Sequence, residues 1–280
     1  MPNVAVVTDS VADLPPQITE QSGITVVPLV VRFESEIYRD GLDLSPDDFY
    51  TKLKTSKSLP VTSVAPPAVF SEAYDKLAEI TDKVVFISLS SKLSGVYQVA
   101  SQAIGLMKKR CHVEVVDSQW AVMAQGFIVI AAAKAARAGA SLAEVLDIAR
   151  KTIGKVDMRA AFDSLEYLER GGRIGRAQAL LGSLLKINPI IGIKDGEVYP
   201  FGKERSRTKA IEHLYKFAES YGDVESLAVE YATDLVEAEK LVQRLHLDYP
   251  RTPILLSHAS PVIGAHTGPS LILVSVLGDR

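Results

Sequence analysis

Three short apolar runs constrain the fold of the first half of the chain more than any other feature. They cover residues 3–9 (NVAVVTD), 84–89 (VVFISL) and 113–118 (VEVVDS). Continuous runs of this kind are typical of strands that are covered on both faces. Helical patterns accompany them near residues 67–81, 95–109 and 119–138. The alternation of strands and helices predicts an α/β fold with a doubly wound parallel sheet and right-handed crossovers.

The pattern changes from about residue 157. Residues 158–164 (MRAAFDS) predict a strand, and residues 165–185 predict two short helices around a glycine break. Residues 187–202 predict a hairpin that turns at Asp195-Gly196, a dipeptide typical of tight hairpins. The remaining expected elements are a helix near 206–221, a strand near 226–232, a helix near 234–247 and strands near 253–258 and 271–277. This order predicts a mixed-sheet α/β domain.

A chain of 280 residues suits two domains. We expect an N-terminal parallel α/β domain over 1–155, with a β insertion near 24–60, and a C-terminal mixed α/β domain over 156–280. In the insertion, residues 24–45 predict one or two strands, and the following SPDD predicts a capped helix start rather than a metal site. Because no flexible linker separates the domains, a ligand is expected between them.

Composition excludes several classes of protein. A net charge of −3 provides no basic field for nucleic acid. Cys111 is the single cysteine, which excludes an intramolecular disulfide and fits a reducing, cytoplasmic location. The N-terminus does not resemble a signal peptide. The most apolar segment, WAVMAQGFIVIAAAKAA, is interrupted by Gln125, Gly126 and Lys134, so it predicts a buried helix rather than a membrane span. No metal-binding motif is present, and no metal or cofactor is expected.

The stretch SLSSKLSGVYQVA, residues 88–100, places four serines and Gly95 where a strand ends and a helix begins. Three interpretations are open: helix capping, a catalytic serine or a site for an anion. Ser94 and Gly95 lie near the helix N-terminus, where free amides and the positive helix end favour an anion. The sequence around Ser94 lacks the nucleophile elbow of hydrolases and the lysine of a phosphate loop.

Four other segments carry polar candidates. Asp9 ends the first strand and is equally compatible with ligand binding and with capping. Thr62 and Ser63 stand in a proline-bounded segment before a helix, where one hydroxyl would suffice for capping. His266 and Thr267 stand between Gly264, Gly268 and Pro269, a pattern that predicts a tight loop displaying the imidazole. Residues 201–211 form a local basic cluster that contains Arg205 and Arg207.

Six motifs together resemble the DegV family. They are VTDSVADLP, PVTSVAPP, LSSKLSGVYQVA, VVDSQWAVMAQG, LEYLERGGRIGR and IGAHTGPS, in order from residue 6 to the last strand. The resemblance implies a bacterial, non-catalytic fatty-acid-binding subunit of a fatty acid kinase system, with ligands such as palmitate or oleate. It also implies two α/β domains with the acyl chain in an apolar tunnel between them. A separate kinase subunit, related to dihydroxyacetone kinases, would phosphorylate the carboxylate to acyl phosphate.

The resemblance also assigns roles to residues. The carboxylate-binding residues that it implies are Thr62, Ser63, Ser94, Gly95, His266 and Thr267. It implies that Arg205 and Arg207 dock the kinase subunit. Ser270 departs from the family pattern, which has a glycine there, so the resemblance does not predict the backbone conformation after Pro269.

Energetics fit a lipid carrier. A buried acyl chain gains about 0.8 kcal/mol per methylene, and its carboxylate must be hydrogen-bonded once it leaves water. Two alternatives remain: a serine esterase or thioesterase that uses Ser94 and His266, and a nucleotide-binding sensor built on the parallel sheet.

Overall fold

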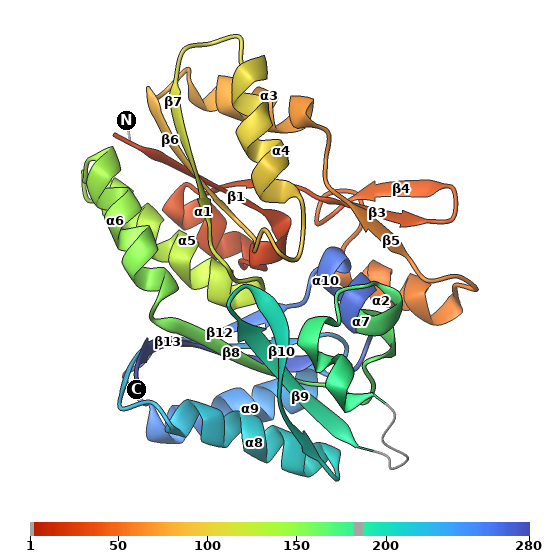
Figure 1. Cartoon of the computed structure of the whole chain (residues 1–280). Helices are drawn as coiled ribbons and strands as arrows, with labels where there is room; N and C mark the ends of the chain where they lie inside the picture. The colour runs from red at the N-terminus through yellow and green to blue at the C-terminus, as the bar shows by residue number, and fades with distance from the viewer. Residues whose placement is uncertain (1–2, 182–186) are drawn as a thin grey trace. The chain divides into compact units, whose positions relative to one another are not determined.

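The computed structural model describes residues 3–181 and 187–280 (Figure 1). Packing divides the chain into two compact units. The first comprises Met1–Val30 and Thr62–Gly154, and the second comprises Val31–Val61 and Lys155–Arg280. The chain therefore passes between the units three times.

The first unit is built on a four-stranded parallel sheet in the order β2-β1-β6-β7. The strands are β1 (Ala5–Asp9), β2 (Thr25–Val27), β6 (Lys83–Ser88) and β7 (His112–Asp117). Val7 in β1 aligns with Thr25 of β2 on one side and with Phe86 of β6 on the other. The sheet is parallel because each strand returns through a helical crossover.

Helices cover both faces of this sheet. They are η1 (Ser10–Ala12), α1 (Pro16–Ser22), α3 (Pro67–Leu77), α4 (Val96–Ala103), η2 (Ile104–Leu106), α5 (Val122–Arg137) and α6 (Leu142–Ile153). Figure 1 shows α3 and α4 on one face, with α5 and α6 on the other. Residues 84–87 of β6 are fully buried, as a strand covered on both sides requires. The doubly wound parallel sheet expected from the sequence is confirmed.

The second unit contains a six-stranded mixed sheet in the order β10-β9-β8-β13-β11-β12. Its strands are β8 (Val156–Ala161), β9 (Asn188–Lys194), β10 (Glu197–Glu204), β11 (Asp223–Tyr231), β12 (Ile254–His258) and β13 (Ile272–Asp279). Only the β11–β12 pair is parallel among these described strands. Asp195 and Gly196 both have positive φ, 52° and 80°, so they form the expected tight turn of the β9–β10 hairpin.

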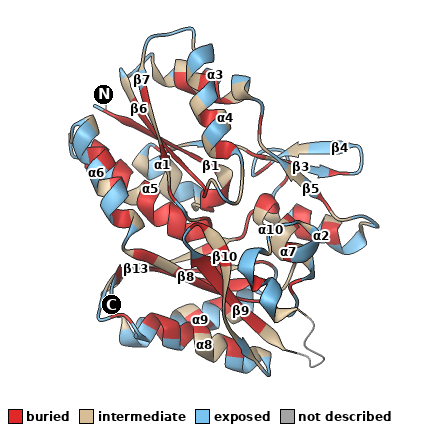
Figure 2. Ribbon diagram, in the orientation of Figure 1, coloured by how far each residue is buried: buried red, intermediate tan, exposed pale blue. Residues whose placement is uncertain are grey.

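Helices α8 (Arg207–Glu219) and α9 (Leu235–Asp248) pack against one face of the mixed sheet. Their buried residues, including Leu214 and Leu241, join Val229 and Val274 of the strands in one apolar core. Figure 2 shows this core as buried sheet strands with buried stripes on α8 and α9. The unit also contains α7 (Glu166–Arg170), η3 (Gly175–Leu180) and α10 (Pro261–Thr267).

The segment 31–61 differs most from expectation. Three strands replace the one or two expected over 24–45: β2 in the parallel sheet, and β3 (Val30–Phe33) and β4 (Glu36–Arg39) in a small sheet with β5 (Val61–Ser63). Helix α2 (Pro46–Thr55) begins as expected, because the Ser45 hydroxyl accepts the Asp48 amide. Residues 31–61 pack with the second unit, whereas the expected insertion belonged to the N-terminal domain. The expected domain limits, 1–155 and 156–280, stay a prediction.

Other departures are small. Helix α6, which starts at a capping box formed by Ser141 and Glu144, was not expected from the sequence. The end of the helical segment expected over 165–185 lies outside the described residues, from residue 182. Within the described part of the chain, no helix is long and apolar enough to cross a bilayer.

Candidate functional site

The serine-rich segment forms the loop Leu89–Gly95, between the carboxyl end of β6 and the start of α4. Its backbone is tied to the neighbouring loop after β7. The Ser90 amide donates to the Trp120 carbonyl at 2.8 Å, and the Ser91 amide donates to Asp117 Oδ1 at 3.1 Å. The loop therefore lies at the carboxyl edge of the parallel sheet, where open α/β proteins bind ligands.

Asp9 holds the start of this loop from inside. Its carboxylate is fully buried and accepts the Leu89 amide at 2.8 Å and the Val11 amide at 3.1 Å. Gln125 Nε2 lies 3.3 Å from the same carboxylate. Burial raises the pKa of Asp9 to about 6, and these hydrogen bonds only partly oppose that shift. Asp9 thus fixes the β6–α4 loop; it is a supporting residue that the sequence left undecided between ligand and cap.

Most hydroxyls of the serine cluster have structural uses. Ser88 Oγ donates to the Val116 carbonyl at 3.3 Å, and Ser91 Oγ donates to Asp117. Ser90 Oγ accepts the Lys92 amide at 3.3 Å. These three serines tie the strand end and the loop together.

Ser94 differs from them. Its amide donates to the Ser90 carbonyl at 3.2 Å, but its hydroxyl makes no hydrogen bond with any residue that the structure describes. Its side chain is half-buried, one residue before the N-cap of α4. An available hydroxyl therefore stands beside the free amides of a helix N-terminus, which together can bind an anion.

Gly95 occupies the N-cap of α4 without any side-chain cap. A Cβ at this position would have the Val64 side chain as its nearest neighbour, at 4.0 Å. The glycine is therefore not required by crowding, and it leaves the helix amides open. The same contact places the segment after Ser63 next to the start of α4.

Thr62 and Ser63 lie in strand β5 rather than in a loop, with Thr62 half-buried and Ser63 exposed. Neither caps the following helix, because the N-cap of α3 is Pro66 and has no side-chain hydrogen bond. Capping therefore does not explain this pair of hydroxyls. The structure brings their segment together with Ser94 and Gly95 within the first unit.

His266 lies in the last turn of helix α10, so the prediction of a tight loop that displays it was wrong. Gly264 lies within this helix and packs against aromatic rings of α2, which leave no room for a side chain: a Cβ there would lie 2.5 Å from Phe49 Cε1. The imidazole is half-buried and packs against Gly171, where a Cβ would lie 2.4 Å from His266 Nδ1. Gly264 had suggested a loop, but it is a position where helix α10 packs closely against α2.

The electrostatics of this site keep the imidazole neutral. Burial, and to a smaller extent the positive charge of Arg173, together lower the pKa of His266 to about 4. At neutral pH the ring carries one N–H and no net charge, so it can donate one hydrogen bond. Arg173 is a neighbour that sequence reasoning did not single out for this role.

Residues around His266 have internal partners. Thr267 Oγ1 donates to the Ile263 carbonyl at 2.8 Å, so it would have to give up that bond in order to donate to a ligand. The Ser270 hydroxyl accepts the Asp163 amide at 3.1 Å. The backbone after Pro269 is therefore held by the serine side chain.

The two arginines expected to dock a partner differ. Arg207 forms a fork with Glu237, at 3.0 Å from Nε and 2.6 Å from Nη2, and donates to the Ser270 carbonyl at 2.8 Å. Its side chain is 27% exposed, whereas Arg205 lies on the surface. Arg207 therefore has a structural use in the second unit, and docking stays a prediction for both residues.

The esterase alternative needs a base beside Ser94. His112, the single histidine in the first unit's sequence, pairs with Glu114 at 2.8 Å at the amino end of β7. His258 packs between the rings of Tyr50 and Tyr231, and its Nε2 lies 2.7 Å from the Ala232 carbonyl. His266 thus stays the candidate base for that reaction.

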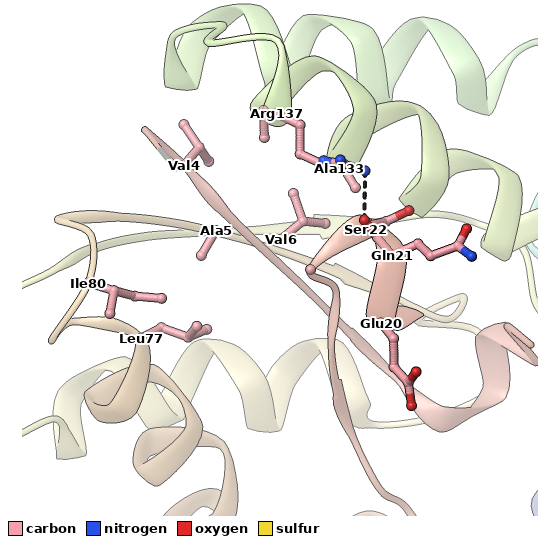
Figure 3. Close-up of a pocket in the computed structure, with 12 residues that line it drawn as sticks. Val4, Ala5, Val6, Glu20, Gln21, Ser22, Leu77, Ile80, Ala133 and Arg137 are labelled. Carbon is pink, nitrogen blue, oxygen red and sulfur yellow. Dashed lines mark hydrogen bonds between the residues drawn. The ribbon is translucent and has the colours of Figure 1, made fainter. Parts of the chain in front are cut away.

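A separate pocket of about 460 Å³ lies at the amino end of β1 (Figure 3). Apolar side chains such as Val4, Leu77 and Ile80 line it, and Arg137 donates to the Gln21 carbonyl at its rim. None of the described residues that line it belongs to the predicted carboxylate site. This pocket is therefore distinct from the serine loop, which stands at the opposite edge of the sheet.

These features define a class of protein: a two-unit α/β chain, with one parallel and one mixed sheet, that presents polar groups suited to an anion. The family model for DegV, described as "Uncharacterised protein, DegV family", matches residues 3–279. Protein DegV of Bacillus subtilis is 37% identical over 275 residues, covering 95% of this chain and 96% of that protein. The chain belongs to the DegV family.

Solved structures of DegV proteins have the same fold. The crystal structure of DegV from Bacillus subtilis, described as a fatty acid binding protein, has a TM-score of 0.90 and 33% identity, and the match covers 99% of this chain and 100% of that one. A DegV family protein from Thermus thermophilus, described by its fatty acid binding, has a TM-score of 0.89 and 32% identity with the same coverage.

Proposed function

We propose that this chain binds a long-chain fatty acid and holds its carboxylate for a separate kinase subunit to phosphorylate. The observation that carries the proposal is the unengaged Ser94 hydroxyl at the amide end of α4. In this proposal the chain itself performs no chemistry. The fatty acid binding described for its relatives from Bacillus subtilis and Thermus thermophilus supports the choice of ligand.

The proposed head-group contacts are neutral donors. Ser94, the amides after Gly95, Thr62 or Ser63 and the neutral imidazole of His266 would share the carboxylate. Hydrogen bonds compensate a carboxylate that has left water, whereas a bidentate guanidinium would bind it more strongly and lower its reactivity towards a phosphoryl donor. A seat of hydroxyls and one uncharged imidazole therefore suits an acid that must later attack a phosphate.

The tail supplies most of the affinity in this proposal. An acyl chain the length of palmitate or oleate could contribute on the order of 10 kcal/mol at about 0.8 kcal/mol per methylene. Its position between the two domains is a prediction that rests on the family resemblance alone.

Native mass spectrometry of the purified full chain tests the ligand. We expect a mass increment that matches a long-chain fatty acid, and we expect Ser94→Ala to retain less of it. Ser101→Ala is the matched control, because Ser101 lies in α4 and its hydroxyl donates only to the Tyr97 carbonyl, at 2.8 Å. Failure to retain or take up palmitate or oleate would contradict the proposal.

A coupled assay tests the partner. A kinase subunit related to dihydroxyacetone kinases, with ATP and oleate, should form acyl phosphate only when this chain is present. Arg205→Ala should lower turnover while lipid retention persists; lost retention would show that Arg205 acts on the ligand site. Labelling of Ser94 by a fluorophosphonate, with ester hydrolysis, would favour the esterase instead.

A further inference from the structure

A second unassigned pocket, of about 600 Å³, lies in the second unit beside β10 and α8. Arg159 of β8 lines it together with Phe201 and Phe217. None of the residues proposed for the acyl head group or for docking lines it. The pocket therefore needs an explanation of its own.

Arg159 is buried, with 6% of its surface exposed. Its Nη1 donates to Asp157 Oδ1 and, at 2.6 Å, to the Met158 carbonyl. Its Nε and Nη2 donate to no residue in the described part of the chain. A buried guanidinium with three of its five N–H donors unused is costly unless another acceptor reaches it.

Aromatic rings determine the direction from which such an acceptor can come. The guanidinium carbon lies 3.3 Å from the Phe201 ring centroid and 4.6 Å from that of Phe217. Strand β9 makes room for this stack with Gly192, where a Cβ would lie 2.8 Å from Phe201 Cε2. Because aromatic rings stack on the guanidinium, we expect a further acceptor to bind in the guanidinium plane, at the edge formed by Nε and Nη2.

The charges behind Arg159 do not balance. The carboxylate of Asp157 also accepts the Tyr221 hydroxyl at 2.9 Å and Arg280 Nη2 at 2.8 Å, so one anion serves two guanidinium groups.

The acidic groups that line the pocket already have partners. Glu204 lies 3.1 Å from His213, and Glu212 pairs with Arg244. The pocket wall also carries Lys209 and Lys216, which are exposed on α8, and Lys216 lies 3.9 Å from Glu212. The lining thus holds three cationic side chains, those of Arg159, Lys209 and Lys216, against two carboxylates. The pocket therefore has an excess of positive charge.

We propose that this pocket binds the oxyanion group, phosphate or carboxylate, of a small molecule through the Nε–Nη2 edge of Arg159. That edge matches the two oxygens of an oxyanion, which arginine binds as a fork. Lys209 and Lys216 supply charge at the rim. This site is separate from the acyl carboxylate site, because it shares no residue with it.

Calorimetric titration of the full chain with inorganic phosphate and with benzoate, at constant ionic strength, tests the proposal. We expect saturable binding of at least one of them, weakened at least about tenfold by Arg159→Met, because hydrogen bonds to a charged group are lost. Arg150→Met, an exposed arginine of α6, is the matched control and should leave the affinity unchanged. The Ser94→Ala variant should also bind these anions with unchanged affinity, which separates this site from the fatty acid site.

The double variant Lys209→Gln/Lys216→Gln keeps the test valid if Arg159→Met fails to fold, since both lysines are exposed. We expect it to weaken binding by about threefold to tenfold through lost charge. Phosphate binding alone would identify a phosphate-bearing ligand, and benzoate binding alone a carboxylate-bearing one. Absence of saturable binding for both probes, or equal affinity in Arg159→Met, would overturn the proposal.

Discussion

Two segments proposed to bind the head group, one in each unit, are held in opposite ways. In the first unit, the Ser94 loop is fixed by buried polar groups: Asp9 accepts its first amide, and Asp117 accepts another. In the second unit, His266 is fixed by close packing against Gly171, and its environment keeps it uncharged. One part therefore depends on a hydrogen-bonded carboxylate, and the other depends on the absence of side chains.

This difference predicts distinct responses to perturbation. A polar network fails when one acceptor is lost, because buried amides are left without partners. A packed imidazole fails when a neighbour becomes larger. The two parts should also respond oppositely to acid, because Asp9 and His266 have pKa values shifted in opposite directions.

The largest expected effect is that opposite response. Asp9 has its pKa raised from 3.8 to about 6, so the folded state binds its proton more readily and acidification from pH 7.5 to pH 4 adds about 2 kcal/mol to the free energy of unfolding. His266 has its pKa lowered from 6.5 to about 4, so acidification over a similar range removes about 3 kcal/mol. The two contributions largely cancel in the wild type.

Replacing either Asp9 or His266 alone should reveal the pH dependence that the other residue contributes. Chemical denaturation between pH 7.5 and pH 4 should show Asp9→Asn losing more stability than the wild type, and His266→Gln losing less. Over this pH range the difference between the variants should reach about 5 kcal/mol. Parallel curves for the two variants would contradict the opposed titration.

The next effect concerns packing around the imidazole. Gly171→Ala places a Cβ 2.4 Å from His266 Nδ1, and we expect it to lower the free energy of unfolding by about 2 kcal/mol and to reduce lipid retention. Gly222→Ala is the matched control in the same unit, because nothing lies within 4 Å of its Cβ. Equal stability of the two variants would show that His266 has room to move.

A smaller effect is expected at neutral pH when Asp9, which supports the β6–α4 loop, is replaced. Asp9→Asn removes one acceptor for the Leu89 and Val11 amides but also removes a buried charge, so we expect a net loss of about 1 kcal/mol. Amide hydrogen exchange should accelerate selectively at Leu89 or Val11. Asp75→Asn, an exposed carboxylate that accepts the Lys108 and Lys109 amides, should leave the Leu89 amide unaffected.

The smallest effect concerns the turn after β7. Gln119 is exposed with φ of 59°, a conformation that glycine adopts without strain, so Gln119→Gly should raise the free energy of unfolding by about 0.5 kcal/mol. Gln98→Gly, in the middle of α4, should instead lower it by about 1 kcal/mol. Thermal unfolding distinguishes these opposite signs.

The sequence predicted the sheets better than the small segments between them. The strands near residues 3–9 and 84–89 were found because continuous apolar runs depend on burial on both faces, a local property of the sequence. The packing role of Gly264 was not found, because it depends on rings of α2 more than 200 residues earlier in the chain. The sequence alone therefore does not distinguish a glycine in a loop from a glycine at a packing contact.

The site was predicted in the same uneven way. The motif around Ser94 was visible, but the sequence could not separate Ser94 from Ser91. That distinction requires knowing that Ser91 reaches Asp117, 26 residues away, whereas Ser94 reaches no described side chain. Arg207 similarly resembled a surface charge until its pairing with Glu237 was visible.

The assignment of residues 31–61 to the second unit has a consequence for biosynthesis. Helix α2 leaves the ribosome about 200 residues before α10, the helix that it contacts through Gly264. At about 5–20 residues per second, α2 waits roughly 10–40 s for that partner. Neither unit can be expressed as one uninterrupted fragment, so a truncation after residue 155 would leave an orphaned segment exposed to chaperones and proteases.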